Sequence, residues 1–221
     1  MVDITTEVVS DTAELARRAA EHVAAAARAA VAARGVFTFA VSGGRTPWAM
    51  FAELARESVP WAQVEIYQAD ERVAPDGDPD RNLTHLREAL GSAPAIVHPM
   101  PVTAADLTVA AGSYGAQLPS AFDLVHLGLG PDGHTASLVP GDPVLSLTGA
   151  RVGVTQPYLG HRRMTLTYPA LDAAREIMWL IAGADKQVPL RQLYARDVSI
   201  PGARVSTTKQ VVFADVAAAG T

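Results

Sequence analysis

Residues 36–47 read VFTFAVSGGRTP, and the order of residue types in this stretch indicates the fold class. The apolar run from Val36 to Val41 has the length of a buried strand and is bounded by glycines. The turn Ser42 to Arg45 follows it. Thr46 and Pro47 then predict the start of a helix, with Thr46 as N-cap and Pro47 at the first helical position. A strand, a glycine-rich turn and a helix in this order are typical of one unit of a parallel α/β sheet.

The same alternation recurs along the chain. Short apolar runs predict further strands at residues 64–68, 123–129, 164–167, 176–181 and 211–214, with a short extended piece near 96–97. Helices are expected at residues 12–34, 46–57, 80–90, 104–118 and 186–194, the first capped by Asp11 with Glu14 three residues later. We therefore predict an α/β fold with a mainly parallel sheet flanked by helices. No linker divides the chain, so residues 1–221 are expected to form a single domain.

The bulk composition argues against several classes of protein. The net charge of -5 lacks the basic excess that is usual in nucleic-acid binders. The absence of cysteine excludes disulfides and thiolate metal sites. No secretory signal is visible, and no apolar run reaches the roughly 18 residues of a membrane span. We expect a cytoplasmic protein that binds neither nucleic acid nor membrane, as a monomer or small homo-oligomer.

Three polar motifs directly follow predicted strands. They are Ser42 to Thr46, Asp70 to Arg72, and Gly130 to Thr135. Because ligands of parallel α/β sheets bind outside the carboxyl ends of the strands, the three motifs are expected to share one edge and one site. Taken alone, the first motif is equally consistent with a tight turn, and the second is more often a solvated loop.

The first motif has the chemistry of an anion-binding loop. Gly43 and Gly44 let the backbone approach a ligand closely, and the helix N-terminus that follows offers free N–H groups to a phosphate. Ser42 and Thr46 flank the two glycines and are assigned to the same binding loop. The motif is not a Walker A loop, because no Gly-Lys-Ser/Thr follows. In the second motif, the guanidinium of Arg72 is suited to holding a phosphate or carboxylate bidentately.

Residues 128–133 read GLGPDG and match the dinucleotide-binding pattern G-x-G-x-x-G. Pro140 cuts short any long helix after this loop, and no second strand with a terminal acidic residue follows about 20 residues later. We therefore expect no dinucleotide. The chain also lacks HExxH and G-x-S-x-G, so neither a metal site nor serine-hydrolase chemistry is expected. The sequence predicts an enzyme site without a cofactor.

His134 is the most informative residue of the third motif. It lies in a glycine-rich loop at the functional edge of the predicted sheet, although an incidental loop histidine is the alternative. The other histidines have no comparable setting. Among them, His126 is expected on a strand beside the core.

Taken together, the motifs resemble the 6-phosphogluconolactonase family. Four stretches carry the resemblance: residues 41–47, residues 70–73, residues 128–138 with Pro140, and residues 163–167 running on to 183–186. The resemblance implies a modified Rossmann-like fold related to glucosamine-6-phosphate deaminases. It also implies hydrolysis of 6-phospho-D-glucono-1,5-lactone to 6-phospho-D-gluconate, the second step of the oxidative pentose phosphate pathway.

The related deaminases and isomerases are the main alternative. They share the glycine-rich loop and the Asp-Gly-His core, but typically have Tyr in place of Arg72 and an acid–base Glu in place of Val139. A sugar-phosphate-binding protein without catalysis is a third possibility, against which Asp132 and His134 both argue. The chain departs from the lactonase pattern at Val139, where Phe is usual, and lacks the usual Trp after residue 202.

The resemblance and general ester chemistry suggest roles for the third motif. Lactone hydrolysis needs a base for the attacking water and donors for the tetrahedral oxyanion. His134 is the expected base, because histidine titrates near neutral pH, and Asp132 is expected to orient its imidazole. Backbone N–H groups around Gly130 and Gly133 are the candidate oxyanion donors.

The remaining candidates are expected to bind the substrate, a phosphorylated sugar lactone. Arg72, Arg163 and Lys186, together with the loop from Ser42 to Thr46, are the candidates for holding the phosphate. Asp70 is expected either to contact sugar hydroxyls or to pair with Arg72.

Overall fold

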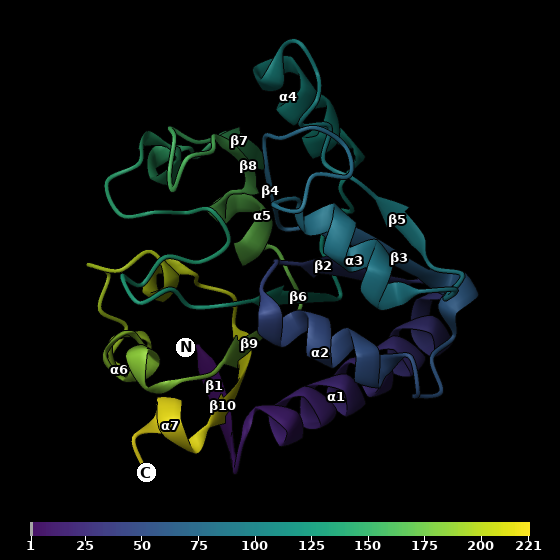
Figure 1. Ribbon diagram of the computed structural model, residues 1–221, viewed down its shortest axis with the longest axis vertical. Helices are drawn as coiled ribbons and strands as arrows, with labels where there is room; N and C mark the ends of the chain where they lie inside the picture. Colours follow the sequence, from purple (N-terminus) through teal and green to yellow (C-terminus); the bar gives the residue numbers. More distant parts are fainter. Residues whose placement is uncertain (1) are drawn as a thin grey trace.

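The computed structural model describes residues 2–221, and its largest element is a seven-stranded parallel sheet (Figure 1). The strands of this sheet are β1 (Asp3–Val9), β2 (Phe37–Val41), β3 (Val64–Gln68), β5 (Ile96–His98), β6 (Leu124–Leu127), β9 (Ile177–Ile181) and β10 (Lys209–Asp215). Their order is β1-β10-β9-β6-β2-β3-β5, and neighbouring strands pair in parallel. The predicted mainly parallel α/β fold is therefore confirmed.

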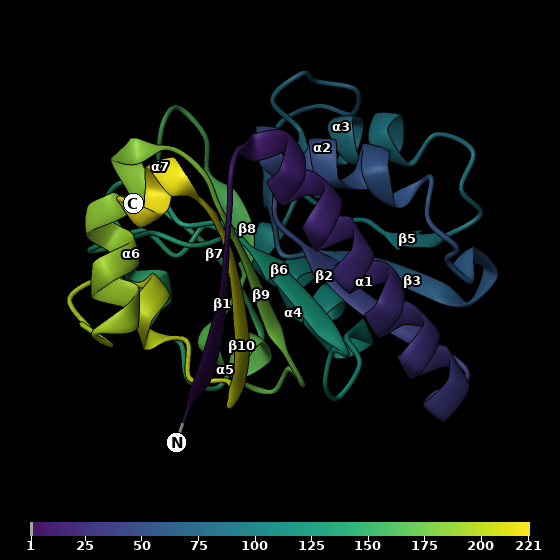
Figure 2. The same cartoon turned by 90° about the horizontal axis from the view of Figure 1, so that it is seen from below.

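Helices cover both faces of the sheet. They are α1 (Thr12–Arg34), α2 (Arg45–Leu54), α3 (Asn82–Leu90), α4 (Leu107–Gln117), α5 (Tyr168–Asp172), α6 (Gln187–Tyr194) and α7 (Val216–Ala219). Short 3-10 turns occur at η1 (Trp61–Gln63), η2 (Pro143–Ser146), η3 (Ala184–Lys186) and η4 (Gly202–Arg204). Helices α1 to α3 pack on one face around Phe39 and Met50, whereas α4 to α6 pack on the other around Phe122 and Trp179. Figure 2 shows α1 lying along the sheet.

The local sequence explains the limits of α1. The Asp11 carboxylate accepts hydrogen bonds from the N–H groups of Ala13 and Glu14, as an N-cap does. Gly35 ends the helix in the left-handed conformation with φ 79° and returns its N–H to the carbonyl of Val31. No helix among residues 2–221 is long and apolar enough to cross a membrane.

The start of α2 differs from the sequence prediction. The N-cap is Gly44, with φ 132°, and the helix runs from Arg45 to Leu54, so Thr46 as N-cap was wrong. The chain turns at Gly44 because only glycine readily adopts that φ, and this moves the helix start ahead of the Thr-Pro pair. No side chain caps this end.

A second, three-stranded sheet was missed by the sequence analysis. It consists of β4 (Asp70–Arg72), β7 (Val152–Val154) and β8 (Arg163–Leu166), antiparallel in the order β4-β8-β7. The sequence favours a solvated loop for Asp70 to Arg72, because three charged residues carry no apolar periodicity. Pairing with β8 makes the segment a strand and sets Arg72 directly opposite Arg163.

Candidate active site

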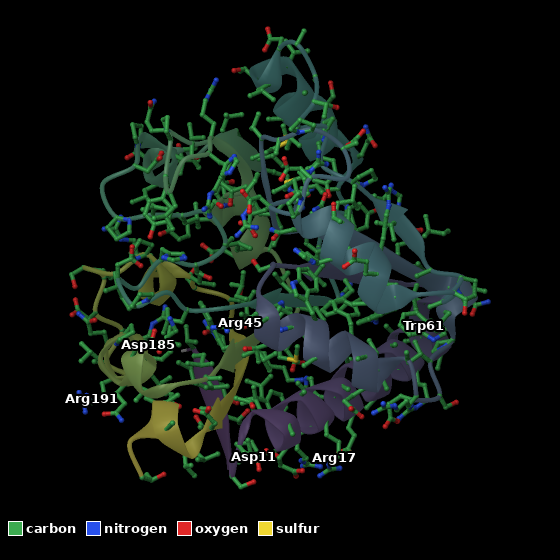
Figure 3. The ribbon with its side chains drawn as sticks, viewed as in Figure 1. Asp11, Arg17, Arg45, Trp61, Asp185 and Arg191 are labelled. Atoms are coloured by element: carbon green, nitrogen blue, oxygen red, sulfur yellow. The ribbon has the colours of Figure 1, made fainter. Side chains whose placement is uncertain are left out.

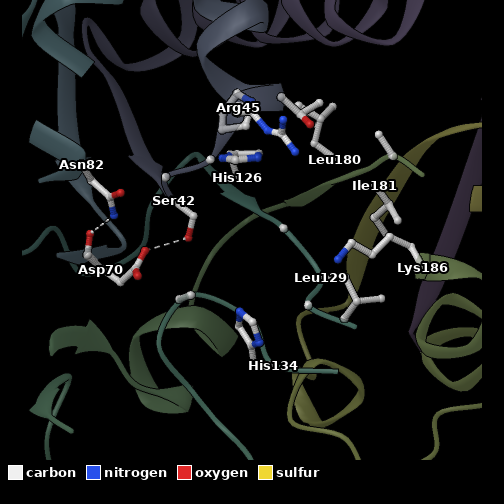
Figure 4. Close-up of a pocket in the computed structure, with 18 of the residues that line it drawn as sticks. Ser42, Arg45, Asp70, Asn82, His126, Leu129, His134, Leu180, Ile181 and Lys186 are labelled. Atoms are coloured by element: carbon white, nitrogen blue, oxygen red, sulfur yellow. Dashed lines mark hydrogen bonds between the residues drawn. The ribbon is translucent and has the colours of Figure 1, made fainter. Parts of the chain in front are cut away.

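The three polar motifs gather around one cavity of about 370 Å³ at the carboxyl ends of β2, β6 and β9 (Figure 4). The predicted site residues that line it are Ser42, Gly43, Gly44, Thr46, Asp70, Arg72, Gly130, His134, Arg163 and Lys186. Asp132 and Gly133 are not among the lining residues. In Figure 3, Arg45 at the start of α2 and Asp185 in η3 mark two further parts of the lining. The expected convergence of the motifs on one edge is confirmed.

His134 is held by the carboxylate of Asp132. The Nδ1 atom of His134 lies 2.5 Å from Oδ1 of Asp132, and the backbone N–H of His134 donates to the same oxygen at 3.1 Å. Because an ionised carboxylate only accepts hydrogen bonds, Nδ1 carries the proton, and in the neutral imidazole the lone pair is then on Nε2. Burial raises the pKa of Asp132, but the hydrogen bonds and charge of His134 outweigh it and hold the pKa below its usual value.

The glycines of this loop make room for neighbouring side chains. A Cβ on Gly130 would lie 2.1 Å from Nδ1 of His134, so the imidazole folds back over a position that must be glycine. The N–H of Gly130 donates to the carbonyl of His134 at 2.8 Å, and that of Gly133 donates to the carbonyl of Gly130 at 2.9 Å. These two N–H groups are therefore already hydrogen-bonded within the loop, and the expectation that oxyanion donors lie around Gly130 and Gly133 stays a prediction.

Tyr158 contacts the Asp132–His134 pair as well as Arg163. The sequence analysis did not select this residue. Its hydroxyl donates to Oδ2 of Asp132 at 3.3 Å, and its ring meets that of His134 edge-on at 5.6 Å. The guanidinium carbon of Arg163 lies 5.1 Å from the centre of the same ring. Tyr158 stands in a turn without motif residues, and only the fold brings it to Asp132.

Two arginines of the cavity, Arg72 and Arg163, each have a guanidinium N–H group without a hydrogen-bond partner in the described chain. Arg163 is buried, and burial lowers its pKa, although the charge of Asp70 acts in the opposite direction. Among residues 2–221, neither Arg72 Nε nor Arg163 Nε has a hydrogen-bond partner, although both atoms are buried. Lys186 Nζ lies 2.8 Å from Asp185. Buried guanidinium N–H groups without acceptors favour an anionic ligand.

Asp70 serves as a hydrogen-bond acceptor for hydroxyl groups. It accepts from Ser42 Oγ at 3.2 Å and from Ser137 Oγ at 2.7 Å. The alternative expectation, an ion pair with Arg72, was wrong: no such pair occurs within the part of the chain that the structure describes. That part also holds no group of three His, Asp or Glu side chains suited to a metal ion.

The middle residue of the second motif has a structural task. Glu71 is fully buried and accepts from the N–H groups of Asn82 and Leu83 at 2.8 and 2.9 Å, where α3 begins. It also pairs with the buried Arg81 at 3.0 Å. Since side chains alternate along a strand, Glu71 points away from the cavity that its two neighbours line. Because all three residues of the triplet are charged, the residue types gave no signal for this division.

Gly43 and Asn82 fit together at the edge of the cavity. A Cβ on Gly43 would lie 1.8 Å from Oδ1 of Asn82, so the position accepts only glycine. Asn82 Nδ2 donates to the carbonyl of Asp70 at 2.9 Å. The first two motifs are thus joined through a side chain that the sequence analysis did not select.

His126 lies at the carboxyl end of β6 and lines the cavity. Its expected position on a strand beside the core is confirmed, since the residue is fully buried. Its place in the cavity lining was not expected.

Comparisons with known proteins agree with this fold. A family model described as glucosamine-6-phosphate isomerases/6-phosphogluconolactonase matches residues 10–213. A 6-phosphogluconolactonase from Synechocystis sp. is 39% identical over 180 residues, 75% of each chain. The crystal structure of a 6-phosphogluconolactonase from Shewanella baltica OS155 superposes with TM-score 0.84 at 30% identity, covering 97% of this chain and 98% of that one. A monomeric glucosamine-6-phosphate deaminase has the same fold, with TM-score 0.86 at 17% identity over 98% of this chain and 99% of that one.

Proposed function

Because the chain belongs to the glucosamine-6-phosphate isomerase/6-phosphogluconolactonase family, we propose that it hydrolyses 6-phospho-D-glucono-1,5-lactone to 6-phospho-D-gluconate. This reaction is a step of the pentose phosphate pathway. The observation that carries the proposal is an imidazole, fixed by a carboxylate, facing the same cavity as four cationic side chains.

We propose that Nε2 of His134 is the general base. It takes a proton from water as the water oxygen attacks the lactone carbonyl, and a tetrahedral oxyanion forms. As the oxyanion collapses, the bond from the carbonyl carbon to the ring oxygen breaks, and the imidazolium returns the proton to that oxygen. Asp132 stabilises the imidazolium in between. Such a base typically contributes about 10²–10⁴-fold to the rate.

The cations of the cavity supply the proposed phosphate site. Arg72, Arg163 and Lys186 offer positive charge, and the uncapped start of α2 offers backbone N–H groups. Fixing the phosphate at a distance from the reacting carbonyl positions the lactone against His134. Asp70, which already accepts from two hydroxyl groups, is suited to accept one from the sugar.

The proposed activity is tested by two assays on the wild-type protein in parallel. The first follows freshly made 6-phosphogluconolactone, with the rate of spontaneous hydrolysis subtracted. The second measures ammonia release from glucosamine 6-phosphate. We expect enzymatic hydrolysis in the first and no ammonia in the second. Ammonia release without accelerated hydrolysis would assign the chain to the deaminases instead.

The cytoplasmic location and the monomeric or small homo-oligomeric state stay predictions. Cell fractionation tests the first and size-exclusion chromatography with light scattering tests the second.

A further inference from the structure

His126 has two buried ring nitrogens without a hydrogen bond of good geometry within residues 2–221, although the backbone of Ser42 lies close enough to act on the pKa of the ring. Most buried side-chain nitrogens are hydrogen-bonded, and an unsatisfied one costs roughly 1–3 kcal/mol. An apolar residue of similar volume would avoid this cost, so the imidazole calls for an explanation.

The strand register directs His126 to one particular part of the cavity. It pairs with Val41 of β2 on one side and Met178 of β9 on the other, and both belong to the apolar cluster beneath α1 and α2. At the end of β6, the ring stands where this cluster meets the cavity. Figure 4 shows it among the lining residues, with Ser42 and Arg45 drawn around it.

The surroundings favour a neutral ring that donates one hydrogen bond. Its strand neighbours are uncharged, and the charged group drawn beside it in Figure 4 is the cationic Arg45. Burial lowers the pKa of His126 to about 4, against a smaller opposite effect of the Ser42 backbone, so the ring carries a single N–H at neutral pH. A neutral imidazole does not neutralise the charge of Arg45, so this cation stays available to an anion that enters the cavity.

The adjoining end of α2 indicates which ligand group the ring meets. Gly43 and Gly44 make no backbone hydrogen bonds through their N–H groups within the described chain, and no side chain caps the helix. Free N–H groups at a helix start and a buried imidazole N–H together form a set of donors without an acceptor. A phosphate, with several acceptor oxygens, suits this arrangement better than a single sugar hydroxyl.

We propose that His126 is a binding residue for the ligand's phosphate group, donating its ring N–H to a phosphate oxygen held at the start of α2. The inference rests on the proposed function, whose phosphate site it completes. His126 lowers the stability of the free protein and raises its affinity for the ligand, because its ring N–H gains an acceptor in good geometry only when the phosphate is bound. Its replacement by an apolar residue should therefore move stability and binding in opposite directions.

The test uses His126→Leu and His126→Gln, with Met178→Leu as a control for repacking of the same apolar cluster. Calorimetry measures the Kd of 6-phosphogluconate. Competition against 6-phosphogluconate measures the Kd of inorganic phosphate. We expect His126→Leu to bind both ligands at least about tenfold more weakly, as loss of one hydrogen bond to a charged group predicts. His126→Gln keeps a donor and should recover part of the affinity. Met178→Leu should bind as wild type does.

Thermal unfolding without ligand supplies the second measurement. His126→Leu should melt at the same temperature as wild type or higher. Phosphate affinity of His126→Leu within twofold of wild type overturns the proposal. So does a loss of affinity that His126→Gln fails to recover in part. Weakened 6-phosphogluconate binding with unchanged inorganic phosphate binding assigns the ring to the sugar and also contradicts it.

These outcomes are separable from failure of the proposed function. A wild-type protein that binds 6-phosphogluconate without hydrolysing the lactone refutes the proposed activity and leaves the role of His126 intact. A wild-type protein that hydrolyses the lactone while His126→Leu binds phosphate normally refutes only the role of His126.

Discussion

One oxygen of Asp132 binds both the backbone and the ring of His134: Oδ1 lies 3.1 Å from the backbone nitrogen and 2.5 Å from Nδ1. The first contact fixes the loop, and the second fixes the ring relative to that loop. The orientation of the imidazole is therefore set before any substrate arrives. Nε2 is the ring nitrogen left free for chemistry.

Asp132→Asn should lower kcat far more than it changes KM. An amide cannot stabilise an imidazolium as a carboxylate does, and its NH₂ group favours the wrong tautomer of His134. We expect a loss of about 10²–10⁴-fold in kcat, measured by steady-state kinetics on the lactone. Asp106→Asn, at the N-cap of α4, is the matched control and should keep wild-type kcat. A kcat within threefold of wild type for Asp132→Asn would remove Asp132 from the mechanism.

Two variants of Tyr158 separate its hydroxyl from its ring. Tyr158→Phe loses the hydrogen bond to Asp132 but keeps the edge-on contact with His134 and the contact with Arg163. We expect it to lower kcat severalfold with little change in KM. Tyr158→Leu also removes the ring beside Arg163 and should raise KM in addition. Identical kinetics for the two variants would show that the hydroxyl and the ring have no separate tasks.

Arg72→Ala should mainly weaken binding of the phosphorylated substrate. A lost hydrogen bond to a charged group costs about 1.5–3 kcal/mol, which corresponds to a rise in KM of roughly 10- to 100-fold. Arg56→Ala is the control, since Arg56 lies on the surface and pairs with Glu53. An unchanged KM for Arg72→Ala takes Arg72 out of the phosphate site.

The stability of the free protein should depend on pH through His126. Burial lowers its folded-state pKa to about 4, whereas an unfolded histidine titrates near pH 6.5. Between these values the unfolded chain binds a proton that the folded chain does not. The free energy of unfolding should therefore fall by on the order of 1 kcal/mol per unit as pH drops through this window. Below about pH 4 both states hold the proton, and this contribution stops changing.

Urea unfolding at pH 7 and pH 5 measures this effect. His126→Leu should lose less stability between the two pH values than wild type does, because the other titrating groups are common to both proteins. An equal loss in the two proteins would show that the imidazole is not buried in its neutral form.

The sequence predicted the sheet and the shared site because both follow from local rules. The strand–turn–helix at residues 36–47 sets β2 and α2, and the carboxyl ends of parallel strands meet at one edge. Strand β1 was missed although it is rich in β-branched residues, because it lies at the sheet edge and its burial pattern follows no strict alternation. The single-domain organisation stays a prediction.

The missed parts of the site depend on contacts between distant segments. Tyr158 reaches Asp132 across 26 positions, and β4 exists only because β8 pairs with it. The hydrogen bonds that occupy the N–H groups of Gly130 and Gly133 form within the loop itself and depend on its exact backbone path. None of these features leaves a periodic or compositional signal.

The central claim is that His134 activates the attacking water, and His134→Ala tests it most directly. Its kcat on fresh 6-phosphogluconolactone, corrected for spontaneous hydrolysis, is measured beside its Kd for 6-phosphogluconate. The account predicts a kcat lowered by about 10²–10⁴-fold, with a Kd within a few fold of wild type. A variant that binds the product normally and hydrolyses the lactone at near wild-type rate would contradict it.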